Sequence, residues 1–234
     1  DLVGISINFS VAKANGLEIL NLVKKYEKKI LTVFGGVHST FDFQDLIDRG
    51  ADMVFLREAD NTFPDFIRYA KDRKEFNSGV NGFAYKLDNE VKKIEYIAPP
   101  KFEDLPMPAW DMIDTANYYK ISSLCLVKNE LGSSEPSAII QTLRGCVAKC
   151  TFCSVRNFNG FGVRTRKVKD VVDEIELFVN KYGIKFIEVV DDDFTADVPR
   201  AIEICKEIIK RKLDVTWSLD NGIRLGTITE ELAE

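Results

Sequence analysis

The sequence has little of what several classes of protein require. Its 234 residues contain a single histidine and no apolar run near the roughly 20 residues that cross a bilayer. It has no charged N-terminal region followed by the apolar core of a secretory signal. The net charge is -5, and acidic and basic residues are interspersed, which leaves no basic stripe for a phosphate backbone. We therefore expect a cytoplasmic protein without a membrane span and without a nucleic-acid partner.

Cysteine is also scarce, and its distribution is uneven. An odd total of five in a chain without a secretory signal disfavours a disulfide framework and favours metal or redox chemistry. Three of the five cluster at Cys146, Cys150 and Cys153. Cys125 and Cys205 lie in apolar patterns, where a thiol behaves as a small hydrophobe, so both are predicted to be core residues.

The first part of the chain alternates short apolar runs with amphipathic stretches. These lie at residues 3–7, 17–26, 30–34, 41–47, 52–56 and 63–70. The alternation is typical of a βαβαβα series, in which parallel strands are joined by helical crossovers. From residue 78 to 97 the pattern predicts a hairpin around Asp88 and Asn89, and Pro99 and Pro100 then interrupt regular structure.

A second βα series begins at residue 138. We expect strands at 138–143, 186–190 and 215–219, a helix from Val168 to Tyr182, and a helix capped by Asp197. Thr227 and Glu230 resemble a capping box for one more helix. The chain lacks an initiator Met and opens on a strand pattern. We therefore expect a piece of a longer protein that includes only the first three strands of a second sheet.

The spacing of the clustered cysteines is Cys-x3-Cys-x2-Cys. Three thiolates at these gaps can bind three irons of a [4Fe-4S] cluster and leave the fourth iron open to another ligand. A zinc knuckle and a cluster of core thiols are the alternatives. Structural zinc takes four ligands, however, and His38 lies in the other half of the chain.

The string from Arg144 to Cys153 resembles the cysteine motif of the radical S-adenosylmethionine (SAM) family. The spacing agrees, Phe152 is the aromatic residue before the last cysteine, and a strand precedes the loop. In that family the open iron chelates the amino and carboxylate groups of SAM, and an electron from the cluster cleaves SAM to a 5′-deoxyadenosyl radical. The resemblance implies a partial (β/α)6 barrel with its active site at the strand C-termini, and contact of Phe152 with SAM through its backbone.

Asp191, Asp192 and Asp193 follow a predicted strand, where the resembled family has a segment that holds the SAM amino group. A carboxylate there can bind an ammonium group, although three in a row repel one another unless cations or donors offset them. The resemblance implies a SAM-binding role within this triplet, and a solvated acidic turn is the alternative. Arg224 resembles a position near the SAM carboxylate or ribose. The alternative interpretation is an exposed surface arginine.

The first half resembles a cobalamin-binding module of the flavodoxin-like class. Ser6 and the Gly35-Gly36 pair match its Ser-x-Leu and Gly-Gly elements, although Asn8 replaces the leucine. A nucleotide tail along a sheet edge needs a hydroxyl partner and close backbone approach. Two glycines also occur in any tight βα turn, and His38 is either a cofactor neighbour or a capping residue.

The order of motifs across the chain resembles the cobalamin-binding (B12-dependent) radical SAM family. The Gly35-Gly36 element precedes the Leu105–Asp111 segment, which precedes the cysteine loop. Arg57–Asp60 departs from the family's Gly-Glu-Gly-Glu turn, and the histidine motif of the lower cobalamin ligand is absent from these residues. The resemblance implies an α/β fold with a truncated flavodoxin-like (Rossmann-like) cobalamin half before the first part of a partial (β/α)6 barrel.

The predicted domains are 1–75 for the partial cobalamin-binding domain, 76–136 for a hairpin and connector, and 137–234 for the N-terminal part of the barrel. The resemblance implies an anaerobic enzyme that uses a [4Fe-4S] cluster, SAM and cobalamin to transfer a methyl group to an unactivated centre of a small-molecule substrate. It also implies an electron donor such as flavodoxin or ferredoxin. The alternatives are radical cyclisation, rearrangement or sulfur insertion without cobalamin chemistry, and a non-catalytic iron-sulfur or corrinoid binding module.

Overall fold

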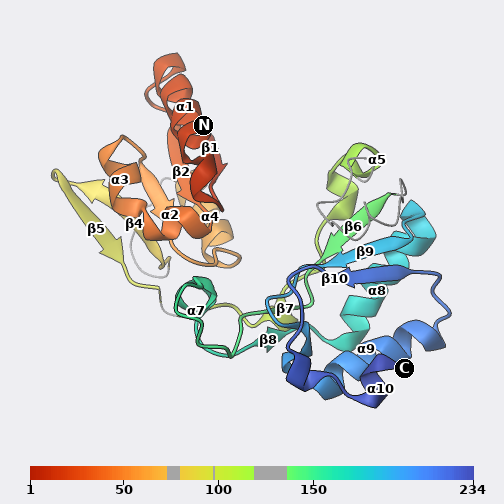
Figure 1. Cartoon of the computed structure of the whole chain (residues 1–234). Coiled ribbons are helices and arrows are strands. Elements are labelled where there is room, and N and C mark those ends of the chain that lie inside the picture. The colour runs from red at the N-terminus through yellow and green to blue at the C-terminus, as the bar shows by residue number, and fades with distance from the viewer. Residues whose placement is uncertain (73–79, 97, 119–135) are drawn as a thin grey trace. The chain divides into compact units, whose positions relative to one another are not determined.

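The computed structural model describes residues 1–72, 80–96, 98–118 and 136–234 (Figure 1). It forms two compact units, Asp1–Pro100 and Lys101–Glu234, which are described separately. Cys125 and much of the predicted connector lie outside the described residues. Among the described helices, none combines the length and the apolar character needed to cross a membrane.

The first unit is built on one five-stranded sheet in the order β1-β2-β3-β4-β5. Its strands are β1 (Leu2–Ser6), β2 (Leu31–Gly35), β3 (Met53–Phe55), β4 (Phe83–Leu87) and β5 (Glu90–Ile94). The first three are parallel, as the βα alternation predicts, and they place Ser6 opposite Gly35. The predicted hairpin is β4–β5. It extends this sheet because β4 pairs antiparallel with β3.

Helices cover both faces of this sheet. They are α1 (Lys13–Tyr26), α2 (Val37–Phe41), α3 (Phe43–Asp48) and α4 (Thr62–Asp72), and a 3-10 turn (Ser10–Ala12) precedes α1. Ile5, Phe34 and Leu46 belong to a core cluster on one face, whereas Phe55 and Phe66 belong to a separate cluster with Val33 on the other. The two clusters follow from the alternation of side chains along each strand.

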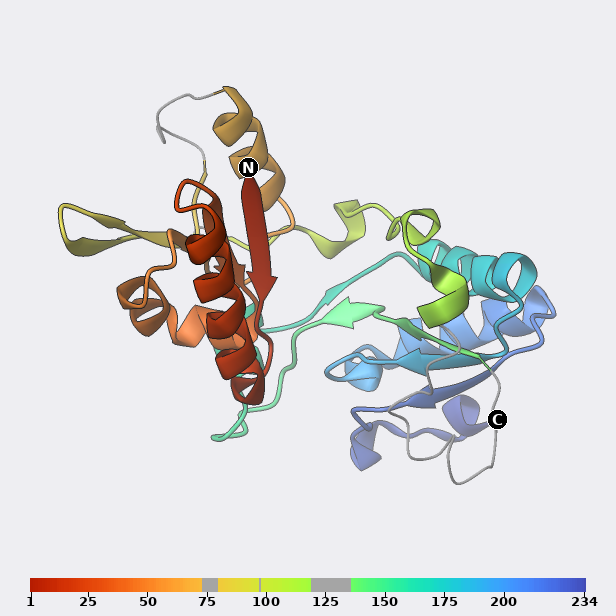
Figure 2. The ribbon, with the colours of Figure 1, turned by 90° about the horizontal axis from the view of Figure 1, so that it is seen from above.

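The second unit contains a parallel sheet in the order β10-β9-β6. Its strands are β6 (Ser137–Ile140), β9 (Phe186–Val189) and β10 (Thr216–Leu219), and α8 (Val168–Tyr182) and α9 (Val198–Lys210) lie along one face of it (Figure 2). The remaining elements are β7 (Leu143–Arg144), α7 (Val155–Asn159), β8 (Arg164–Thr165), α5 (Thr115–Tyr118), α10 (Glu230–Ala233) and 3-10 turns at Phe102–Asp104, Trp110–Met112, Phe194–Ala196 and Leu225–Thr227.

Helix ends in this unit show where local signals hold and where they fail. The Asp197 side chain accepts a hydrogen bond from the Arg200 backbone N–H at 3.1 Å, which confirms the predicted cap of α9. The capping box predicted at Thr227 is wrong. The cap of α10 is Thr229, while Thr227 donates its hydroxyl to the Arg224 carbonyl.

Candidate functional site

The three clustered cysteines lie on the loop between β7 and α7. Cys146 is half-buried, Cys150 and Cys153 are exposed, and all three thiols are free. The Ala148 backbone N–H donates to the Cys146 sulfur at 3.3 Å. Phe152 is 91% exposed. The loop therefore presents sulfur ligands to solvent, with one backbone donor already directed at a sulfur.

The base of this loop is fixed by a glycine and a carboxylate. Gly145 has φ +96°, and an added Cβ would lie 2.3 Å from the Gly162 carbonyl oxygen, so only glycine fits there. The Asp192 carboxylate accepts from the Gly145 N–H at 2.9 Å and from the Asn159 side-chain amide at 3.1 Å. Because Asn159 is the last residue of α7, Asp192 joins the start of the cysteine loop to the end of the helix that follows it.

Asp191 holds the strand end before the loop. Its carboxylate accepts from the backbone N–H groups of Thr142 and Leu143, at 2.6 and 3.0 Å, and from the Thr142 hydroxyl. Arg200 donates to the Thr142 carbonyl at 3.0 Å. Burial raises the pKa of Asp191 and lowers that of Arg200, and each residue's charge opposes the other's shift. Two buried residues of opposite charge that both bind Thr142 therefore set where β6 ends.

The same network continues to the start of the second unit. The Arg200 Nε donates to the Arg166 carbonyl at 3.1 Å, and the Arg166 guanidinium pairs with the buried Glu174 carboxylate. The Trp110 indole N–H donates to Glu174 at 2.6 Å, and its ring meets Phe178 edge-on at 5.1 Å between centroids. The network thus ties α8, α9 and the Trp110 turn to the base of the cysteine loop.

Asp193 has a different environment from its two neighbours. Its side chain is 3% exposed, one oxygen lies 2.9 Å from the Arg224 Nε, and the same oxygen lies 4.0 Å from the Cys146 sulfur. The other oxygen, Oδ1, is buried and accepts no hydrogen bond within the described structure. The structure therefore brings Asp193, Arg224 and Cys146 together and leaves the other oxygen of Asp193 without a donor.

These residues fit the two cofactors that the cysteine motif implies. SAM carries an ammonium and a carboxylate on its methionyl end, and Asp193 and Arg224 offer the opposite charges. In the described part of the chain, no group of three or more His, Cys, Asp or Glu side chains is placed to hold a single metal ion. In a cubane each thiolate binds a different iron, so the thiols do not converge on one point.

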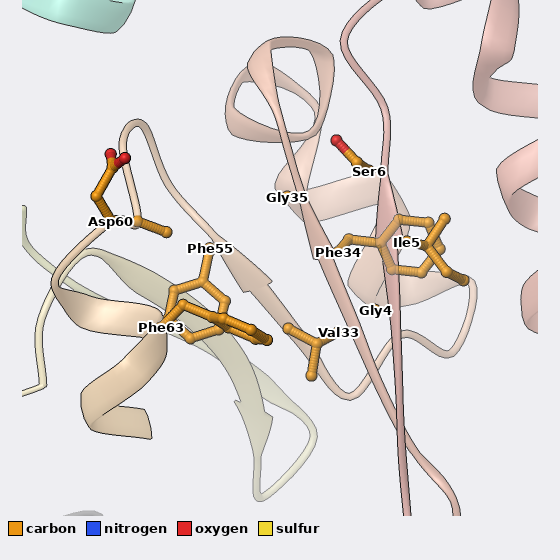
Figure 3. A pocket seen from close by; sticks show the side chains of 10 residues that line it. Gly4, Ile5, Ser6, Val33, Phe34, Gly35, Phe55, Asp60 and Phe63 are labelled. Carbon is orange, nitrogen blue, oxygen red and sulfur yellow. The ribbon is translucent and has the colours of Figure 1, made fainter. Parts of the chain in front are cut away.

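A pocket of about 370 Å³ lies on the sheet of the first unit (Figure 3). It is lined by Gly4, Ile5, Ser6, Val33, Phe34, Gly35, Phe55, Ala59, Asp60 and Phe63. The Val33, Phe55 and Phe63 side chains form an apolar wall, and Ser6 and Asp60 lie toward one end. A Cβ added to Gly35 would meet nothing within 4 Å, so the pocket reaches the β2 backbone. An apolar floor with a hydroxyl beside bare backbone fits the nucleotide tail of a cobalamin.

The next two cobalamin candidates lie outside this pocket lining. Gly36 has φ +98°, and an added Cβ would lie 2.6 Å from both the Ile7 carbonyl oxygen and the Asn8 side-chain oxygen. The His38 Nδ1 lies 3.1 Å from the Ser10 hydroxyl. Gly36 is thus required by the turn itself, and His38 is held by the 3-10 turn that begins at Ser10.

Comparison with known proteins identifies a family for each half of the chain. Residues 1–67 match the B12 binding domain family, and residues 140–234 match the Radical SAM superfamily. The chain is 28% identical to a protein named as an uncharacterized methyltransferase of Pyrococcus horikoshii, over 100% of this chain and 48% of that protein. It is 30% identical to the anaerobic magnesium-protoporphyrin IX monomethyl ester cyclase of Rubrivivax gelatinosus, over 95% of this chain and 39% of the enzyme.

A solved structure shares the fold. The cobalamin-dependent SAM radical enzyme OxsB, with aqua-cobalamin and SAM bound, matches with a TM-score of 0.73 at 23% identity, over 93% of this chain and 30% of that one. A B12-binding domain followed by a radical SAM domain defines the class of protein. The chain belongs to the B12-dependent radical SAM family, whose cofactors are a [4Fe-4S] cluster, SAM and cobalamin. It spans about half or less of the length of these relatives.

Proposed function

We propose that the protein containing this chain is an enzyme that cleaves SAM at a [4Fe-4S] cluster and uses cobalamin to transfer a methyl group to an unactivated centre of a small molecule. The observation that carries the SAM part is Asp193, a buried carboxylate with an unfilled oxygen beside Cys146 and Arg224. The pocket over Gly35 supports the cobalamin part.

The chain's residues have separate binding roles around the cluster, which when bound supplies the electron that splits SAM. Cys146, Cys150 and Cys153 ligate three irons. Asp193 receives the SAM ammonium group and Arg224 its carboxylate. The other members of the predicted SAM set take supporting positions: Asp191 and Asp192 hold the loop through backbone donors. Phe152 remains a predicted SAM contact at the exposed loop tip.

The residues predicted to bind cobalamin also have separate roles. Ser6 and Gly35 face the nucleotide tail within the pocket, and Gly36 keeps the β2 backbone close to it. His38 remains a predicted cofactor neighbour, held by Ser10. We further propose that the protein works in the anaerobic cytoplasm and receives electrons from a flavodoxin or ferredoxin.

The test is anaerobic reconstitution of the full-length protein with iron and sulfide. We expect about four irons per chain with cubane absorbance, and 5′-deoxyadenosine formed from SAM. Cys150→Ala should lose the cluster and SAM cleavage. Cys205→Ala is the matched control, because that thiol is half-buried on α9, away from the loop. SAM cleavage that survives in Cys150→Ala would refute the proposal.

A second candidate keeps radical chemistry but uses it for cyclisation, rearrangement or sulfur insertion. The similarity to a relative named as a cyclase favours it. Retention of a corrin by the purified protein, with methyl transfer from labelled SAM, supports the first candidate. Cluster binding without SAM cleavage would instead indicate a non-catalytic iron-sulfur module.

A further inference from the structure

Glu188 is a buried acid in the middle of the central strand of the second sheet. It lies on β9 between Ile187 and Val189, which belong to the core cluster packed against α8 and α9. Successive side chains of a strand point to opposite faces. Glu188 therefore points to the face away from these helices, which is the inner face of the partial barrel. Its side chain is nevertheless 1% exposed.

No described residue pairs with this carboxylate. The Oε1 atom is buried and accepts no hydrogen bond from the described part of the chain. Its register partners, Ile139 on β6 and Ser218 on β10, share its face, and neither carries a positive charge. The Ser218 hydroxyl donates to Asp220. The inner face of the three strands thus presents an acid without a cation beside it.

Other buried acids of this unit are partnered, which marks Glu188 as different. Glu174 pairs with Arg166 and accepts from Trp110, and Asp191 accepts from Thr142. A carboxylate is costly to bury unless cations or hydrogen-bond donors meet it, and an apolar residue would fill the same space at no such cost. The position therefore calls for a cationic partner outside the described residues.

The height of Glu188 on its strand indicates what that partner is. Glu188 is the last residue but one of β9, which ends at Val189, and the site residue Asp193 follows four residues beyond that end. A group that reaches Glu188 would thus lie deeper in the barrel than the methionyl end of SAM. We propose that Glu188 is a substrate-binding residue that receives an ammonium or guanidinium group. This proposal rests on the proposed function, since it needs a substrate beneath SAM.

The experiment uses the full-length protein with its cluster and SAM bound. Propylammonium and methylguanidinium chloride are the probes, with propionamide as the neutral control and sodium chloride holding ionic strength constant. The concentration dependence of the melting temperature yields an apparent Kd for each. We expect saturable stabilisation by the cations, and a loss of cation affinity of at least about tenfold in Glu188→Gln.

Glu203→Gln is the matched control, because it removes the same charge from the exposed side of α9 and should leave cation affinity unchanged. Iron content verifies that each variant is folded. If Glu188→Gln fails this check, Glu188→Asp keeps the charge and should retain weakened, saturable binding. Equal cation affinity in Glu188→Gln, equal affinity for propionamide, or no saturable cation effect in the wild type would overturn the proposal. The wild type's iron content and 5′-deoxyadenosine formation test the proposed function separately.

Discussion

The cysteine loop and the pocket of the first unit are two sites built by opposite means. The loop is positioned by charged side chains, since Asp191 and Arg200 hold the strand before it and Asp192 joins its start to the end of α7. The pocket exists because side chains are missing, as at Gly35, where an added Cβ would meet nothing. The first kind of site is disrupted when a group is removed, and the second when a group is added.

The largest effect expected from this comparison is at Arg200. Arg200→Met removes a positive charge that favours ionised Asp191, and it removes donors from the Thr142 and Arg166 carbonyls. Leaving these buried carbonyl groups without their charged donor costs about 1–3 kcal/mol each. Urea unfolding followed by tryptophan fluorescence would measure this loss of stability, because both tryptophans of the sequence lie in the second unit.

A matched control is Arg211→Met. Arg211 links Asp173, Glu176 and Glu207 near the surface, so its loss should cost about 1 kcal/mol or less. An Arg200→Met protein as stable as this control would show that the buried network does not hold the loop.

The next largest effect should be at Asp193. Asp193→Asn keeps the shape and removes the charge that we assign to the SAM ammonium group, which corresponds to a loss of about 10- to 100-fold in SAM affinity. Equilibrium binding of SAM to the reconstituted protein measures it, and iron content should stay at the wild-type value. Asp220→Asn is the control on a neighbouring loop. Unchanged SAM affinity in Asp193→Asn would reassign the ammonium site.

The pocket predicts a contrast between two adjacent glycines. Gly36→Ala forces a Cβ to within 2.6 Å of backbone at φ +98°, so it should destabilise the first unit by about 1–3 kcal/mol. Gly35→Ala should leave stability within about 0.5 kcal/mol, because its Cβ enters open space. Gly35→Ala should instead lower cobalamin retention. Thermal unfolding with corrin absorbance separates the two outcomes, and equal destabilisation by both would contradict them.

The smallest effect concerns Asp52, a charged side chain of the first unit. Burial opposes ionisation of Asp52, but hydrogen bonds from Lys24 and Thr32 outweigh it and lower the Asp52 pKa. The carboxylate then stabilises the fold above its unfolded pKa of about 3.9, and this contribution is lost as pH falls through the lower folded pKa. Asp52→Asn should cost about 1 kcal/mol or less at pH 7, since the pair is partly exposed, and less at pH 3, which is below the unfolded pKa. Unfolding at both pH values tests this.

Much of the fold could be predicted from local patterns. Strand and helix periodicity located the parallel strands of both sheets, and the cysteine spacing needs only eight consecutive residues to be recognised. The attachment of the β4–β5 hairpin to the first sheet could not be predicted, because pairing with β3 depends on distant residues. The Thr229 cap was missed because Thr227 matched the capping-box spacing better.

The roles within the aspartate triplet could not be separated from sequence. Three identical side chains differ only in what lies opposite them. Asp191 meets Thr142, Asp192 meets Gly145, and Asp193 meets Arg224. Those partners lie 31 to 49 positions away along the chain. Glu188 was overlooked for a related reason, since an acid within an apolar run carries no motif.

The Asp192 contacts have a consequence for how a cluster enters this protein. Because one carboxylate connects Gly145 to Asn159, the segment from Gly145 to Asn159, which carries the three cysteines, is closed by contacts that the protein makes with itself. Loop closure is then part of folding, and cluster assembly has only to order the thiols within a loop already closed. A protein arranged in this way can fold before its metal binds.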